Sequence, residues 1–320
     1  MQNYNYFQKI FHEIVLGNSF INKSLFELEK QLFKFKNFTS EYHIFITGLP
    51  RSGTTILLNY IYQTNCFSSF KYSDMPFILS PNLFNFFKFK KKNKNFERFH
   101  SDNIKINYDS PESFDEVFFS NFDTTNYDEE LKYFISSICI KCKKERYLSK
   151  NNNNYKRIEI IKKNLKNSLF LIPYRLPLDH CYSLLNQHRN FLKLDDDDYF
   201  VKRYLRYLGH NEFGENHLEW FKPIKFINKL EINYWLEQWH LFYENLINKF
   251  SNENFIFFIN YEHLCSNSHY VNRLNKIIGV SNESKNFFKK VKGKQFNLNY
   301  DEALLKECEN TYKKLAAITF

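Results

Sequence analysis

Residues 48–55, with the sequence Gly-Leu-Pro-Arg-Ser-Gly-Thr-Thr, constrain the fold of this chain more than any other segment. They follow a short apolar run at 42–47 and precede a segment at 54–64 whose apolar residues recur with helical spacing. A G-x-x-x-x-G spacing between a strand and a helix is typical of loops that bind phosphate. Only seven of the 320 residues are glycine, so this close pair indicates a backbone shape that requires glycine. The segment predicts an α/β fold whose first strand ends in an anion-binding loop.

The chemistry expected of this loop follows from its backbone. Gly53 allows the chain to pass close to an anion, and the N–H groups of residues 52–55 face the same space where the helix begins. The partial positive charge of a helix N-terminus and the hydroxyl groups of Thr54 and Thr55 strengthen the attraction. The plainer alternative is a Gly/Pro turn, with Pro50, that precedes a helix and binds nothing.

Position 54 separates this loop from those of nucleoside triphosphatases. Such enzymes carry a lysine where this chain has Thr54, and that lysine reaches the β- and γ-phosphates. The sequence also lacks an obvious acidic residue at the end of an apolar strand that would hold Mg²⁺. Arg51 instead supplies a fork-shaped cation, which suits a single terminal anionic group. A divergent P-loop kinase or NTPase is therefore an alternative and not the first expectation.

Three apolar runs set the expected fold class. The runs at 42–47, 168–172 and 255–260 are continuously apolar, unlike the alternating pattern of a sheet with one exposed face. Segments with helical spacing separate them, including a long one at 228–249. The sequence predicts an α/β fold of the P-loop nucleotide-binding kind, with a central parallel sheet flanked by helices.

The remainder of the chain is expected to be helix and loop. Residues 1–40 have helical spacing and are predicted to form an N-terminal extension, ahead of a P-loop domain at 41–320. Two Lys/Asn-rich stretches, 88–95 and 141–168, indicate solvated helix faces or loops within helical insertions. After the second apolar run a further helix is expected, with Asp179 as its N-cap.

Composition excludes several classes of protein. The mean hydropathy is −0.54, and no stretch approaches the roughly 18 consecutive apolar residues that a spanning helix needs. The N-terminus lacks a charged segment followed by an apolar one, so we expect a cytoplasmic protein. The net charge of +10 favours an anionic partner without choosing among nucleic acid, phosphorylated cofactor, glycan and membrane surface. The six cysteines are expected to be reduced thiols, and no metal site is expected.

Residues 49–55 resemble the loop that binds the 5′-phosphosulfate in sulfotransferases that use 3′-phosphoadenosine 5′-phosphosulfate (PAPS). In this family, an arginine and a serine eight positions apart, after another strand, bind the 3′-phosphate. Arg175 and Ser183 have this spacing. Three further segments resemble parts of the bacterial sulfotransferase group: 110–114, 209–214 and 261–264. The resemblance extends over roughly residues 43–265.

The resemblance implies that residues 41–320 form a sulfotransferase-like domain. It implies transfer of a sulfuryl group from PAPS, without a metal, to a hydroxyl or amine of an acceptor that attacks in line. Arg51 would stabilise the charge on the departing oxygen, and its removal would cost on the order of 3–4 kcal/mol. The implied PAPS-binding residues are Pro50, Arg51, Ser52, Gly53, Thr54, Thr55, Arg175 and Ser183.

The general base is expected between the two motifs, where family members place a glutamate or a histidine. Asp74 is the best-placed acidic residue, although aspartate is shorter than the expected glutamate. An equally plain interpretation makes Asp74 a turn carboxylate ahead of Met75-Pro76. The competing candidates for the base are His100, Asp102, Glu112 and Glu116.

The identity of the acceptor is open, because a carbohydrate, a lipid, a small molecule and a peptide all carry suitable groups. A basic nucleic-acid-binding protein is a further alternative to an enzyme, and it would bind DNA or RNA with a steep dependence on salt. The aromatic residues are not grouped with basic ones in a stacking motif, so no nucleic-acid partner is expected.

Overall fold

The structure of the chain, a computed structural model, divides into two compact units. The first unit holds Met1–Phe45, Leu58–Ser168 and Asp196–His210, and the second holds Ile46–Leu57, Leu169–Asp195 and Asn211–Phe320. The domain boundary expected after residue 40 lies outside the described residues and stays a prediction. Those described are 6–34, 42–85, 96–97, 105–122, 128–193, 203–204, 206–209, 211–281, 287–288 and 299–319.

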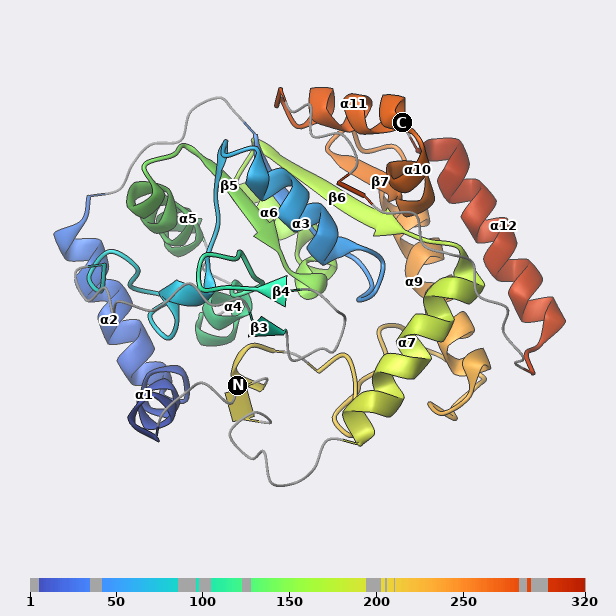
Figure 1. Cartoon of the computed structure of the whole chain (residues 1–320), viewed down its shortest axis with the longest axis horizontal. Helices are drawn as coiled ribbons and strands as arrows, with labels where there is room; N and C mark the ends of the chain where they lie inside the picture. The colour runs from blue at the N-terminus through green and yellow to red at the C-terminus, as the bar shows by residue number, and fades with distance from the viewer. Residues whose placement is uncertain are drawn as a thin grey trace. The chain divides into compact units, whose positions relative to one another are not determined.

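Five strands form a central parallel sheet in the order β2-β5-β1-β6-β7 (Figure 1). Their bounds are His43–Ile46 for β1, Phe67–Ser68 for β2, Arg146–Lys150 for β5, Ser168–Tyr174 for β6 and Ile256–Asn260 for β7. A separate antiparallel pair joins β3, Phe96–Glu97, to β4, Lys105–Ile106. The predicted α/β fold class is therefore confirmed.

Helices account for most of the remaining described residues (Figure 1). The α-helices are α1 Tyr6–Leu16, α2 Ser19–Leu32, α3 Thr54–Gln63, α4 Glu116–Asn121, α5 Asp128–Cys142, α6 Ile158–Asn164, α7 Pro177–Leu192, α9 Ile232–Phe250, α10 Tyr261–Ser266, α11 Ser268–Ile277 and α12 Glu302–Ile318. Two short 3-10 helices are Tyr72–Asp74 and Asn152–Lys156. Within the described part of the chain, no helix combines the length and the apolar character needed to cross a membrane.

The three apolar runs became β1, β6 and β7, and every residue of β1 and β6 is buried. The interpretation of 141–168 as helix or solvated loop was wrong, because β5 lies within it and is buried at all five positions. Its charged ends are the reason that the strand was missed. Arg146 stacks on the Phe67 ring at 4.1 Å, and Lys150 pairs with Glu112 at 3.5 Å, so both charges are accommodated inside the protein.

The N-cap expected for α7 was also wrong. The helix begins at Pro177, with Leu176 as the capping residue, and Asp179 lies in the first turn. Proline suits this first position, because its fixed φ is already helical and its missing N–H would have had no partner there. Asp179 still complements the positive end of the helix.

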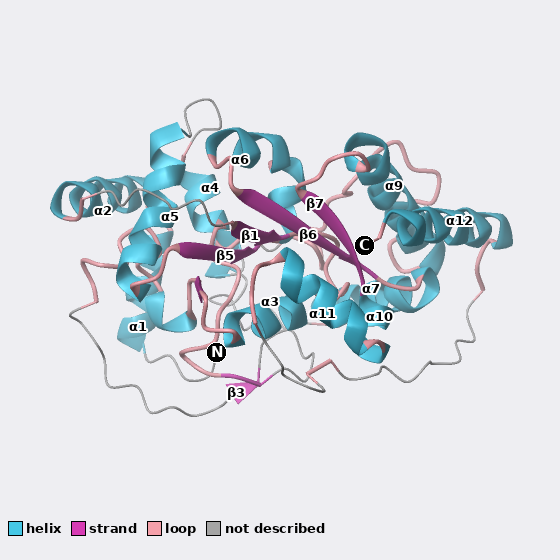
Figure 2. Ribbon diagram, turned by 90° about the horizontal axis from the view of Figure 1, so that it is seen from above, coloured by secondary structure: helices cyan, strands magenta, loops and turns pink. Residues whose placement is uncertain are grey.

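The second unit surrounds β6 and β7 with helices. In Figure 2, α9 lies above these strands and α11 lies below them. Helix α9 packs against α7 and α12, and it buries Trp235 and Trp239 completely, as expected of core residues. This packing holds α7, which carries part of the candidate site.

Candidate functional site

The loop after β1 needs glycine at residue 53. The φ angle of Gly53 is +105°, which side-chain-bearing residues rarely adopt. A Cβ atom there would also lie 2.5 Å from the ring of Tyr261, at the beginning of α10. The chain therefore passes so close to Tyr261 that only glycine fits. Gly48, with φ of +144°, gives the loop its second unusual backbone angle.

The centre of the loop is a tight turn. The N–H of Ser52 donates to the carbonyl of Leu49 over 3.3 Å. Arg51 has a φ of +69°, a left-handed conformation that costs a residue with a side chain roughly 1–2 kcal/mol. Helix α3 then begins at Thr54, and the first N–H groups of a helix have no acceptor within the helix itself. The loop thus presents an arginine and a helix N-terminus together.

The structure brings two expected binding residues, Arg175 and Ser183, into contact with Arg51. Arg51 donates from Nε to Oγ of Ser183 over 3.2 Å. Arg175 donates from a terminal guanidinium nitrogen to the carbonyl of Arg51 over 3.1 Å. Ser183 lies on α7 and Arg175 follows β6, so residues 132 and 124 positions away from Arg51 along the chain meet at the loop. Two guanidinium groups beside a helix N-terminus make this a strongly anion-attracting place.

Two polar atoms here have hydrogen-bonding capacity to spare. Nε of Arg175 is buried and has no hydrogen-bond partner among the described residues, although the guanidinium lies over the Tyr261 ring at 5.2 Å. Oγ of Ser52 is likewise buried and without a partner in the described part of the chain. A buried donor without an acceptor is costly, and an anionic ligand would satisfy it. The residues present therefore fit a bound phosphate or phosphosulfate group.

Behind the loop, His180 joins Pro50 to the core. Its Nε2 lies 2.8 Å from the carbonyl of Pro50, and its Nδ1 lies 3.1 Å from Nε1 of Trp239. Because the indole N–H only donates, Nδ1 accepts and Nε2 carries the proton that binds the carbonyl. Burial, with the charges of Arg175 and Arg51, lowers the pKa of His180 to about 3. The imidazole is neutral and holds the loop in one position.

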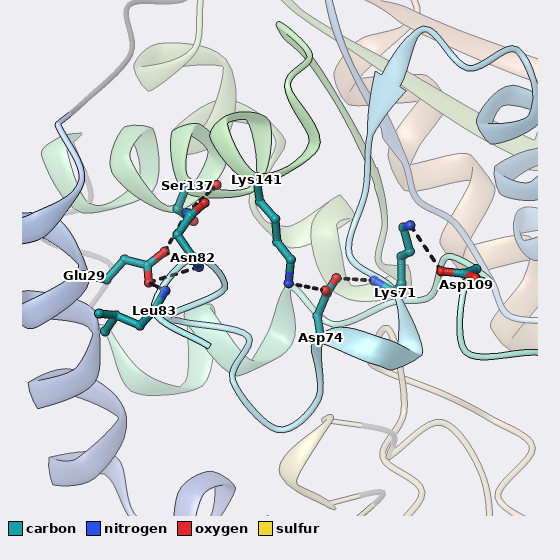
Figure 3. A network of polar contacts seen from close by, with 8 residues as sticks. All are labelled: Glu29, Lys71, Asp74, Asn82, Leu83, Asp109, Ser137 and Lys141. Carbon is teal, nitrogen blue, oxygen red and sulfur yellow. Dashed lines mark hydrogen bonds and ion pairs between the residues drawn. The ribbon is translucent and has the colours of Figure 1, made fainter. Parts of the chain in front are cut away.

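Asp74, the candidate base, lies in the first unit with both carboxylate oxygens occupied (Figure 3). Oδ1 accepts from Nζ of Lys141 over 2.6 Å, and Oδ2 accepts from the backbone N–H of Lys71 over 2.7 Å. The second contact closes the 3-10 turn at Tyr72–Asp74. The hydrogen bond from Lys71 is the contact expected of a turn carboxylate. In this structure the Asp74 side chain is also buried and has the Lys141 ammonium beside it.

The other candidate bases are ion-paired or outside the described residues. Glu112 accepts from Tyr72 over 2.8 Å and lies 3.5 Å from Lys150. Glu116 accepts two hydrogen bonds from Arg157, at 2.6 and 2.8 Å. His100 and Asp102 are not among the residues that the structure describes. Asp74, Glu112 and Glu116 therefore each have a cationic partner, so ion pairing does not distinguish one of them as the base.

A model of the sulfotransferase family matches residues 43–281, which is most of the chain and includes the loop, Arg175 and Ser183. The chain belongs to the sulfotransferase family. This agrees with the resemblance carried by the two motifs, and it makes the protein a transferase by family. No curated protein matches the sequence.

Three solved structures of bacterial sulfotransferases are similar to this chain. Sulfotransferase STF9 from Mycobacterium avium shares 11% identity with a TM-score of 0.44, over 92% of this chain and 74% of that one. Sulfotransferase STF1 from Mycobacterium tuberculosis H37Rv shares 10% with a TM-score of 0.46, over 94% and 84%. A sulfotransferase from Alicyclobacillus acidocaldarius shares 12% with a TM-score of 0.41, over 88% and 96%.

Sequence reasoning did not identify His180 and gave Tyr261 no role, yet both support the sulfotransferase loop. His180 is separated from Arg175 by four residues, and its position within the second motif, between Arg175 and Ser183, was the only available signal. Trp239, its partner on α9, is fully buried, and nothing in the sequence connects it with residue 180. Tyr261 was noticed only as part of a similar segment. Its ring lies against Gly53 although the two residues are far apart in the sequence, and residue spacing carries no information on such a contact.

Proposed function

We propose that this sulfotransferase moves a sulfuryl group from PAPS to a hydroxyl or amine of its acceptor by in-line transfer. The observation that carries the proposal is the contact of Arg51 with Ser183 and of Arg175 with the Arg51 carbonyl. These contacts unite the loop with the motif that resembles a 3′-phosphate site. Family membership supports sulfuryl transfer over phosphoryl transfer, and so does Thr54 at the position of a triphosphatase lysine.

In this proposal the two ends of the nucleotide have different partners. The amides and hydroxyls of residues 52–55, next to Pro50, bind the 5′ end, and Arg175 with Ser183 binds the 3′-phosphate. PAPS, when bound, supplies an activated sulfuryl group on a phosphate leaving group. In the proposal, Arg51 stabilises the negative charge that develops on the leaving oxygen. Arg175 and His180 in turn hold the Arg51 and Pro50 carbonyls, so that the loop does not reorganise during transfer.

For the general base the proposal keeps Asp74. Its carboxylate lies 2.6 Å from Nζ of Lys141, and a carboxylate is a group that can act as a general base. Glu112 and Glu116 have comparable pairs and are the alternatives among the described residues. The proposal involves no metal ion, because arginine side chains and backbone amides carry the charge stabilisation. The acceptor class stays open among carbohydrate, lipid, small molecule and peptide.

A thermal-shift experiment tests the donor assignment. The protein is heated with 3′-phosphoadenosine 5′-phosphate (PAP), with ATP and Mg²⁺, and with ADP. At about one hundred times its Kd, PAP should stabilise the fold by about 2.7 kcal/mol, which raises Tm by several degrees. ATP with Mg²⁺ and ADP should have little effect. A shift with ATP and Mg²⁺ that equals or exceeds the PAP shift would instead support a P-loop kinase or NTPase.

Arg175→Ala supplies the matched test of the 3′-phosphate site. The variant should lose most of the PAP shift, because it removes a guanidinium that the proposal assigns to the phosphate. Arg273→Ala, an exposed arginine on α11 in the same unit, is the control and should keep the full shift. An undiminished PAP shift in Arg175→Ala would contradict this part of the site.

A further inference from the structure

The segment 218–230 before α9, here called the outer loop, exposes large aliphatic side chains. Leu218 is 69% exposed, Ile227 is 77% exposed and Leu230 is 49% exposed. The segment contains no helix or strand, so the exposure does not come from one face of a regular element. Scattered exposed aliphatic residues are ordinary, but three in one short loop form a patch when the loop holds them together.

Side chains of α9 pin the backbone of this loop in place. Gln238 accepts from the N–H of Trp220 over 2.7 Å and donates to the carbonyl of Phe221 over 2.9 Å. The neighbouring Glu237 accepts from the N–H of Lys225 over 2.8 Å and from that of Phe226 over 2.8 Å. A loop without regular structure normally leaves such groups to water. Here the backbone at residues 220–221 and at residues 225–226 is bound by two adjacent side chains of α9.

Lys229 connects the beginning of the outer loop with its end. Its Nζ lies 2.8 Å from the carbonyl of His217, its ammonium lies 3.7 Å from Glu219, and its own carbonyl accepts from Trp235. The lysine side chain therefore connects residue 229, which precedes Leu230, with residue 217, which precedes Leu218. The three exposed side chains belong to one loop whose backbone is held by these contacts.

The aromatic residues of the same loop turn the other way. Trp220 packs on Trp235 with ring centroids 5.9 Å apart, and Phe221 packs on Phe242 at the same distance. Trp220 and Phe221 therefore pack on α9 and are half-buried, while Leu218, Ile227 and Leu230 are exposed. An ordered loop with exposed aliphatic side chains has a surface suited to a partner.

The charge of the outer loop indicates which partner. It contains three lysines and one glutamate, a net charge of +2, and both Lys222 and Lys225 are exposed. Arg189 of α7 adds a cation at the edge, where it donates to the carbonyl of Leu230. Aliphatic tips among lysines match a bilayer interface, where acyl chains lie beneath anionic headgroups. We propose that the outer loop docks this protein on the surface of an anionic lipid membrane.

Vesicle sedimentation tests the proposal without reference to the transfer reaction. The protein is mixed with vesicles of phosphatidylcholine alone and with vesicles of equal parts phosphatidylcholine and phosphatidylglycerol. It should sediment with the second kind and much less with the first, and salt should weaken the binding. Absence of binding to the anionic vesicles at low salt overturns the proposal, and so does equal binding to both kinds.

Two double variants test whether the outer loop makes the contact. Leu218→Gln with Ile227→Gln should lower the partition coefficient at least about tenfold, because two largely exposed aliphatic side chains are lost. The control, Phe20→Gln with Leu32→Gln on α2, removes residues that are 78% and 62% exposed and should leave binding within about twofold. If the control pair weakens binding as much as the loop pair, the contact does not belong to the outer loop.

Charge reversal gives the second arm of the test. Lys222→Glu with Lys225→Glu should reduce binding to the anionic vesicles by an order of magnitude or more, since each lysine near the surface contributes roughly fivefold. Lys306→Glu with Lys313→Glu on α12 changes the net charge equally at two exposed positions. Binding should depend far more on the loop pair. Equal losses would assign the attraction to the overall charge and overturn docking through this loop.

Discussion

The loop at 48–55 and the carboxylate contacts of the first unit use polar groups in opposite ways. Oγ of Ser52, in the loop, and Nε of Arg175, which contacts the loop, are buried and have no hydrogen-bond partner among the described residues. In the first unit, both oxygens of the buried Glu29 accept from backbone N–H groups of Asn82 and Leu83, and Asn82 adds its side-chain amide (Figure 3).

The difference separates buried donors without a partner among the described residues from a buried carboxylate whose hydrogen bonds are made within the protein. Burial raises the pKa of Glu29, and the hydrogen bonds from Asn82 and Leu83 offset part of that effect. Such a carboxylate connects α2 with residues 82 and 83, and its oxygens are already used in hydrogen bonds within the protein. Asp74 resembles Glu29 because both of its carboxylate oxygens accept hydrogen bonds within the protein, yet the proposal gives it a part in the transfer reaction. The variants below test whether each residue acts in the reaction or only in holding the structure together.

The largest effect is expected for Arg51→Ala. Turnover should fall by two to three orders of magnitude, on the order of 3–4 kcal/mol of transition-state stabilisation. The loss should appear in kcat, because the charge on the leaving oxygen develops during transfer. Arg51→Lys keeps a positive charge without the fork and should recover part of the rate. Steady-state kinetics with saturating PAPS measure both, and near-native turnover in Arg51→Ala would remove Arg51 from the chemistry.

A smaller effect, about a hundredfold in turnover, is expected for Asp74→Asn. The matched variant is Lys141→Met, which breaks the same ion pair from the other side and leaves the carboxylate. If Asp74 is the base, the first variant loses turnover and the second keeps it within a few-fold, while both unfold at lower temperature. Kinetics and thermal unfolding of the two variants provide the comparison.

The opposite outcome for this pair is equally informative. Should both variants lose similar stability and retain similar turnover, Asp74 would have the role of Glu29 and serve the turn at Tyr72–Asp74. Glu112→Gln would then be the next variant to assay, because Glu112 is the other acidic residue that contacts this turn, through Tyr72.

The sequence was sufficient for the three strands that are mostly apolar, and for two of the residues that contact the loop, Arg175 and Ser183. β1, β6 and β7 were recognised because a short, continuous apolar run between helical segments is typical of a buried parallel strand. Arg175 and Ser183 were found because their spacing and context carried a family resemblance. Their contacts with Arg51 lie within the predicted neighbourhood, while their roles stay predictions.

The missed features depend on contacts between residues distant in the sequence. β5 has arginine and lysine at its ends, and these residues are buried because Arg146 contacts the Phe67 ring and the Tyr42 carbonyl and Lys150 contacts Glu112. The carboxylate contacts of Asp74 depend on Lys141 of α5, which follows it by 67 residues. Residue spacing within one segment carries no information on such pairs, so the choice between base and turn carboxylate had to stay open.

His180 gives the smallest expected effect, because it acts on the loop only through Pro50. His180→Phe removes the donor to the Pro50 carbonyl and should weaken PAP binding about fivefold, a cost of about 1 kcal/mol. His180→Gln can still donate near the position of Nε2 and should restore most of the affinity. Cys181→Ala, the next buried residue of α7, is the control: it should lower stability and leave PAP affinity unchanged. Calorimetric titration with PAP measures these affinities.

The acid stability of the protein gives His180 a second readout. Its folded-state pKa, about 3, lies below the ordinary value of 6.5, so the unfolded chain takes up the proton more readily. The stabilisation is complete above pH 6.5 and is lost as the pH falls, by about 1.4 kcal/mol per pH unit for one such group. His43, His188 and His217, each with a pKa lowered to about 4 by burial, act in the same direction. Urea unfolding measures the free energy of unfolding between about pH 6 and pH 4. Its slope against pH should be smaller in His180→Phe than in the native protein, by the contribution of one proton. An unchanged slope would mean that His180 is not the buried neutral group that holds the loop.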